Sequence, residues 1–129
     1  MRLLLDTHAL IWAVEQPNRI GAAARSVLED ASNELLVSAA SIWETSIKVS
    51  LGKLSLALPY RQWMTQAISD LGAVVLPITI DCAETQSTLP WRHRDPFDRM
   101  LASQALVEQV PLVSGDEVFD QYGVQRMWD

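Results

Sequence analysis

The sequence has 129 residues, of which 49% are hydrophobic and 20% are charged, so we expect one globular domain spanning residues 1–129 and exclude a disordered chain. The formal net charge of −6 excludes a protein that coats nucleic acid through a broad basic surface, although local binding stays open. The lone cysteine, Cys82, excludes an internal disulfide and a cysteine-rich zinc site.

The N-terminal stretch MRLLLD reaches an aspartate after three leucines, which is too short for a signal peptide. No apolar run elsewhere approaches the length that would span a membrane. We therefore expect a cytoplasmic protein without a membrane segment.

Short apolar runs alternate with helical patterns along the chain. The first run, residues 3–5, is wholly apolar and predicts a central parallel strand that is buried on both faces. The next expected elements are a helix over 7–14, a break at Pro17 and Asn18, a helix over 21–31 and a strand over 35–38.

The second half of the chain continues this alternation. A helix capped by Ser38 or Ser41 is expected to run to Leu51 and to stop at Gly52, before a connector over 54–59. The remaining expected elements are helix 60–71, strand 73–76, helix 80–88 capped by Thr79, a helix from Pro96 to about 109, strand 112–114, a turn at 118–122 and an edge strand at 124–127. The alternation predicts an α/β fold with a mainly parallel sheet.

The helix after the second strand carries an apolar stripe and a candidate functional acid. Ala39, Trp43 and Ile47 recur every four residues and form an apolar stripe on one face of the helix, with Ile42 beside it. Glu44 stands at the flank of the stripe. It is either a functional carboxylate or one half of an exposed ion pair with Lys48, four residues later.

The stretch WRHRDPFDRMLASQA, residues 91–105, combines basic residues with the start of a helix. Asp95 is expected as the N-cap, Pro96 as the first helical residue and Asp98 as the third, where free N–H groups favour negative charge. A purely structural alternative is open, because Asp-x-x-Asp resembles a capping box. The buried face of this helix is predicted from an apolar repeat: Phe97, Leu101 and Ala105.

Four carboxylates are candidates for shared chemistry. Asp6 and Asp116 each follow a predicted strand, and right-handed crossovers would bring such residues to one edge of the sheet. Asp98 stands at a helix N-terminus and Glu44 on a helix face. Clustered carboxylates repel one another unless a cation lies between them, and oxygen ligands suit Mg²⁺ or Mn²⁺ better than zinc. Such a site can lower the pKa of a bound water molecule and stabilise charge on a phosphodiester.

Local structural roles are open for two of these acids. Asp6 could cap the helix that follows it, and Asp116 could be a turn residue after Gly115. Three other kinds of site fit less well. The sequence lacks the glycine-rich nucleotide loops and the G-x-S-x-G nucleophile motif, and position 8 lacks the second aspartate of an aspartate-nucleophile phosphatase. We interpret His8 as a packed helix residue and His93 as part of a basic rim.

Four stretches, LLLDTHALIW, SAASIWETSIKVSLGKL, HRDPFDRMLASQA and LVSGD, span nearly the whole chain in this order. Together they resemble the PIN-domain ribonucleases of the VapC-like toxin kind found in bacterial toxin–antitoxin modules. The resemblance implies a three-layer α/β/α sandwich around a mainly parallel sheet. It also implies that Asp6, Glu44, Asp98 and Asp116 bind the metal, while the role of Asp95 beside them stays open.

The same resemblance implies an endoribonuclease dependent on Mg²⁺ or Mn²⁺, which forms dimers and is inhibited by a cognate antitoxin bound in a groove near the site. We therefore interpret the chain as a toxin that cleaves RNA with metal-activated water. Arg92, Arg94 and Arg99 are expected to hold the RNA backbone, although Arg94 could instead pair with Asp95. The alternatives are a non-catalytic protein-binding module of the same fold and a metal-dependent DNA nuclease.

Overall fold

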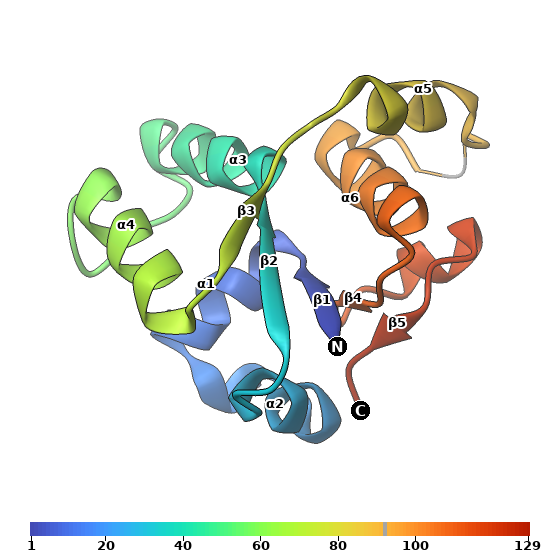
Figure 1. The fold of residues 1–129 in the computed structure, drawn as a ribbon. Helices are drawn as coiled ribbons and strands as arrows, with labels where there is room; N and C mark the ends of the chain where they lie inside the picture. The colour runs from blue at the N-terminus through green and yellow to red at the C-terminus, as the bar shows by residue number, and fades with distance from the viewer. Residues whose placement is uncertain (92) are drawn as a thin grey trace.

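A computed structural model describes residues 1–91 and 93–129 and contains a five-stranded sheet (Figure 1). The strands are β1 (Arg2–Leu5), β2 (Glu34–Ser38), β3 (Val74–Leu76), β4 (Leu112–Val113) and β5 (Arg126–Met127). Their order is β3-β2-β1-β4-β5, and each neighbouring pair is parallel. The expected parallel α/β fold is confirmed, with β1 at the centre and β3 and β5 at the edges.

Helices connect these strands, as the alternating pattern predicts. They are α1 (Thr7–Glu15), α2 (Ala22–Glu29), α3 (Ala39–Ser50), α4 (Tyr60–Leu71), α5 (Ile80–Thr88) and α6 (Pro96–Glu108). Two 3₁₀ helices, η1 (Pro17–Arg19) and η2 (Glu117–Tyr122), occupy the expected break and the expected turn. No helix among the described residues is long and apolar enough to cross a membrane.

Side-chain caps fix where several helices begin. Ser38 caps α3 by accepting a hydrogen bond from Ala40 N at 3.0 Å, which decides between the two expected caps. Thr79 caps α5, and Asp95 caps α6 by accepting from the backbone N–H groups of Phe97 and Asp98. At the other end of α4, Gly72 adopts φ +60°, the left-handed conformation that favours glycine.

The sheet separates two hydrophobic clusters, because successive side chains of a strand point to opposite faces. Leu3 and Leu5 pack with residues of α1, α2 and α4, whereas Leu4 packs with residues of α6 and η2. Figure 1 shows α1, α2 and α4 on one side of the sheet and α5 and α6 on the other. The three-layer α/β/α arrangement is therefore confirmed.

The apolar stripe of α3 is not the buried face of this helix. The Trp43 side chain is 62% exposed, while Ser41, Glu44 and Thr45 are buried. The reason is tertiary: α3 packs against α1 and α6 and turns its polar face toward them. The predicted buried face of α6 holds for Leu101 and Ala105, whereas Phe97 is half-buried and packs edge-on against Trp43.

Candidate metal centre at the carboxyl ends of the strands

Asp6 is the innermost of the four predicted acids. It directly follows β1, is 4% exposed, and caps α1 by accepting a hydrogen bond from Ala9 N at 2.7 Å. Its capping role and a role as a ligand are compatible, because a carboxylate has two oxygens. Burial raises the pKa of Asp6 to about 6 against the lowering effect of the Ser114 hydrogen bond, and the negative charges of Asp116 and Glu44 raise it further.

Glu44 is buried beside Asp6 and not on a solvated helix face. The Thr7 hydroxyl donates a hydrogen bond to Glu44 Oε1 at 2.6 Å, and Lys48 Nζ lies 3.2 Å from Oε2. The expected ion pair with Lys48 therefore exists, but its acidic partner is only 6% exposed. The Thr7 and Lys48 contacts fix the orientation of the carboxylate next to the other acids.

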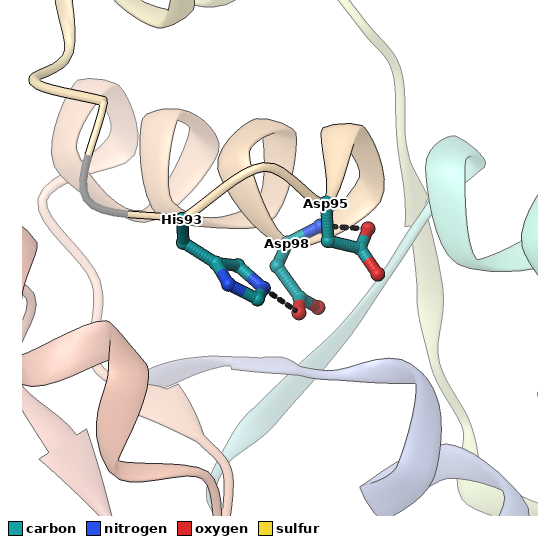
Figure 2. Close-up of side chains that lie close together, drawn as sticks. All are labelled: His93, Asp95 and Asp98. Carbon is teal, nitrogen blue, oxygen red and sulfur yellow. Dashed lines mark hydrogen bonds and ion pairs between the residues drawn. The ribbon is translucent and has the colours of Figure 1, made fainter.

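Asp98 lies in the first turn of α6, at the position that the sequence predicts. Burial raises the pKa of Asp98 to about 6, and the charges of Asp95 and Glu44 act in the same direction. The His93 ring opposes this shift because its Nε2 lies 2.9 Å from Asp98 Oδ2 (Figure 2). Glu44 on α3 is thus close enough to Asp98 on α6 for its charge to raise the pKa of Asp98.

Asp116 lies at the exposed margin of the site, just after β4. Its backbone N–H donates to Ser114 Oγ at 3.0 Å, and its own Oδ1 accepts from Val118 N at 3.0 Å to cap η2. The predicted turn role is therefore present. Asp116 also raises the pKa of Asp6 and lines the same pocket, which places the two carboxylates together.

The four predicted acids are linked by electrostatic repulsion between pairs of carboxylates. Asp116 and Glu44 act on Asp6, and Glu44 also acts on Asp98. Since all four side chains offer carboxylate oxygens, the donor set suits a hard divalent cation. Such a cation would relieve the repulsion that raises the pKa values of Asp6 and Asp98.

His93, which is expected in a basic rim, contacts Asp98 and is a further candidate for this centre. His93, Asp95 and Asp98 can each offer a ligand atom within 4.8 Å of the other two (Figure 2). One oxygen of Asp95 is already used for the N-cap of α6. The position of His93 in the sequence could have indicated this contact, because it lies two residues before the N-cap Asp95 and five before Asp98 in the first turn of α6.

The three predicted RNA-binding arginines have different outcomes. Arg99 is corrected to a structural residue, because its side chain is fully buried and its guanidinium donates to the carbonyl oxygens of Gln86, Leu89 and Pro90. The guanidinium also stacks at 3.8 Å on the Trp91 ring. Arg94 is exposed and forms no ion pair with Asp95 in the described part of the chain. Arg92 lies outside the described residues.

His8 is exposed, which corrects its interpretation as a packed helix residue. The first turn of α1 turns it away from the core and toward an open pocket of about 430 Å³. The pocket is lined by Asp6, His8, Trp12, Arg19, Gly115, Asp116 and Trp128. Two of the predicted acids therefore border a space that is large enough to hold part of a substrate.

Comparison with known proteins gives a consistent family assignment. The family model of the PIN domain matches residues 3–125. The curated protein "Ribonuclease VapC22" of Mycobacterium tuberculosis is 32% identical to this chain over 115 residues, which cover 88% of this chain and 86% of that protein.

Solved structures match the fold over nearly the full length. VapBC2 from Rickettsia felis bound to a promoter DNA fragment matches with a TM-score of 0.72, 17% identity and 100% coverage of both chains. VapBC from Salmonella typhimurium bound to DNA matches with a TM-score of 0.72, 16% identity and coverage of 98% and 97%. VapBC-1 from nontypeable Haemophilus influenzae matches with a TM-score of 0.71 and 17% identity, and the match covers 98% of this chain and 97% of that chain. At these identities, the structural likeness establishes the fold.

Proposed function

Because this chain belongs to the PIN-domain family, we propose that it is a divalent-metal-dependent endoribonuclease that acts as the toxin of a toxin–antitoxin pair. The observation that carries the proposal is the group of mutually repelling carboxylates at the carboxyl ends of the strands. A relative named as a ribonuclease, at 32% identity over 88% of the chain, supports RNA as the substrate.

The residues fit a hard cation, of which Mg²⁺ and Mn²⁺ are the proposed candidates. Burial and neighbouring charges raise the pKa values of Asp6 and Asp98 to about 6, so their ionised forms lack sufficient compensation within the protein. Asp6, Glu44, Asp98 and Asp116 would hold the cation. When bound, it would lower the pKa of water and stabilise negative charge on the phosphodiester.

The protein side chains supply orientation at this site. The α1 cap holds Asp6, and Thr7 and Lys48 hold the two oxygens of Glu44. His93 holds Oδ2 of Asp98, which limits the rotation of that carboxylate. Such fixed carboxylates reduce the reorganisation required when a phosphodiester binds. Arg92 and Arg94 would contact RNA phosphates, whereas the buried Arg99 is removed from this role.

Cleavage of single-stranded RNA tests the proposal directly. The purified protein is incubated with RNA and Mg²⁺ or Mn²⁺, with EDTA as the metal-free control and with DNA of the same sequence as the second substrate. We expect metal-dependent RNA cleavage, its loss in Asp6→Asn, and its retention in Asp70→Asn, which changes an exposed acid on α4. Cleavage of DNA alone would favour the nuclease alternative. Absence of cleavage from both would favour a non-catalytic module.

A cognate antitoxin is the proposed partner, because several solved structures with this fold are VapBC complexes. Expression of the chain alone is expected to arrest growth, whereas Asp6→Asn should not. Coexpression of the protein encoded beside it should restore growth. Harmless, high-level expression of the active wild type would contradict the toxin role without contradicting the nuclease.

We also propose a homodimer, as the family resemblance implies. Apolar side chains are exposed along the edge strand β3 and the segment that follows it: Val74, Val75, Ile78 and Ile80. Such a strip suits burial in a protein interface. Sedimentation of the purified chain checks this proposal, and a monomer at high concentration would contradict it.

A further inference from the structure

The pocket beside Asp6 and Asp116 has aromatic walls. The Trp12 ring lies 6.0 Å from the Trp128 ring at 56° and 5.4 Å from the His8 ring at 38°, measured between ring centroids and planes. These tilted rings do not stack flat on one another, and all three residues line the pocket. The pocket therefore presents aromatic surface directly beside the proposed cleavage centre.

One wall of the pocket is held in place by close packing against glycine. A Cβ atom added to Gly115 would lie 2.9 Å from Cε2 of Trp128, so the indole occupies the space above this glycine. The carbonyl oxygen of Trp128 accepts a hydrogen bond from Ala24 N at 2.9 Å. Trp128 is thus anchored through its backbone at α2 and through its ring at the residue before Asp116.

The pocket also has opposite charges on its lining. Asp6 and Asp116 supply carboxylates, while the exposed Arg19 places its guanidinium carbon 4.2 Å from the centroid of the Trp12 ring. A nucleotide has negatively charged phosphates and an aromatic base, which could each meet a complementary group in the lining of the pocket. Its scissile phosphate would face the acids with their cation, its base would meet the rings, and the neighbouring phosphate would meet Arg19.

We infer that this pocket is a nucleobase-stacking subsite, in which one base beside the scissile bond of single-stranded RNA packs against Trp12, Trp128 and His8. The inference rests on the proposed function and adds a position for the substrate. Unpaired bases stack on aromatic rings and on arginine planes, which explains why a protein of net charge −6 can bind RNA without a broad basic surface. A paired base would stay within its own helical stack and could not fill the pocket.

A coupling experiment with abasic nucleotides tests the subsite. One nucleotide at a time is made abasic across a short RNA with a single cleavage site, and kcat/KM is measured for the wild type and Trp12→Leu. Loss of one base is expected to cost the wild type about tenfold at one position, given the strength of base–aromatic stacking. Trp12→Leu should lose a similar factor on intact RNA and show little further loss on the abasic RNA.

Three further variants make the test specific. Trp12→Phe keeps an aromatic ring and should retain most of the coupling. His8→Ala removes an exposed ring, so it should fold and should weaken the coupling at the same nucleotide even if Trp12→Leu fails to fold. Trp43→Leu changes an exposed tryptophan outside the pocket and should match the wild type at that nucleotide.

Equal abasic penalties in the wild type and the folded pocket variants would overturn the subsite while leaving the nuclease intact. Unchanged cleavage combined with loss of antitoxin inhibition would also overturn it, because the pocket would then bind the partner and not the base. Absence of RNA cleavage by the wild type would overturn the proposed function and this subsite together, before any variant is compared.

Discussion

Asp98 and Arg99 are neighbours on α6, yet the surroundings of their charged groups differ. The guanidinium of Arg99 is fully buried, donates to three carbonyl oxygens and stacks on Trp91. The carboxylate of Asp98 meets His93 but also the charges of Asp95 and Glu44, and burial raises its pKa to about 6. The Arg99 guanidinium thus has hydrogen-bond acceptors within the chain, although its buried Nε has none among the described residues. The Asp98 carboxylate instead lies among further negative charges, as expected of a ligand to a cation.

The largest expected effect is the loss of cleavage in Asp98→Asn. The amide keeps the size of the side chain but gives up the charge that a hard cation requires, so cleavage should fall by more than about 1,000-fold, equivalent to about 4 kcal/mol. The metal-free variant should remain folded, because removing one charge relieves repulsion. Rate measurements are combined with thermal unfolding. If Asp98→Asn cleaved RNA at the rate of the wild type, the proposed difference between the charges of Asp98 and Arg99 would be contradicted.

Arg99→Met should show the opposite pattern, with a large effect on stability. The variant leaves three carbonyl oxygens without their donor, and we expect the free energy of unfolding to fall by about 3 kcal/mol. Urea unfolding measures this change. Arg61→Met, at an exposed position on α4, serves as the matched control and should change stability by less than about 0.5 kcal/mol. Equal stability of the two variants would contradict the structural role of Arg99.

Asp6 predicts an unusual dependence of stability on pH. Its pKa is about 6 in the folded protein and near 3.8 when unfolded, so the folded state binds more protons between these values. Its stabilising contribution is complete below pH 3.8 and is lost as pH rises through 6, by about 2–3 kcal/mol. The difference between the unfolding curves of the wild type and Asp6→Asn isolates this effect. A flat difference would contradict it.

Unfolding measured over the same pH range with Mn²⁺ tests whether Asp6 binds a cation. Mn²⁺ competes with protons for the carboxylates, so its stabilisation of the wild type should grow as pH rises from 5 to 7. Asp6→Asn should show a much smaller Mn²⁺ effect at every pH.

The smallest effect is expected at the helix cap beside these charges. Asp95→Ala removes the acceptor for two backbone N–H groups and should cost about 1 kcal/mol, while Asp95→Asn retains the cap and should be nearly neutral. Both variants should still respond to Mn²⁺, unlike Asp98→Asn. Loss of the Mn²⁺ response in Asp95→Asn would instead make Asp95 a ligand, as its position near His93 and Asp98 allows.

The sequence predicts the fold well because its signals are local. Apolar strands, the Asp95 cap and Gly72 each act within a few residues, and the elements lie close to their expected bounds. Burial of polar residues depends on distant neighbours. Glu44 is buried beside Thr7, 37 positions earlier in the chain, so helical periodicity alone misplaces it.

Charge alone misassigns Arg99 for the same reason. An arginine in a basic cluster favours an exposed interpretation, but its three acceptors come from the chain segment that precedes α6 and are backbone atoms. His8 shows the converse error, because the sequence-based interpretation makes it a packed helix residue, whereas its side chain is exposed. Its exposure follows from the neighbours of α1 and not from the sequence around it.

The close approach of Trp12 and Trp128 gives the protein an optical signature of its own. Two indoles with centroids 6.0 Å apart are close enough for their excited states to couple, so we expect this pair to contribute to the circular dichroism spectrum. Any occupant of the pocket that moves either ring would be expected to change that contribution. The two tryptophans would therefore report on the pocket without an added label, beside the carboxylates that are proposed to hold the cation.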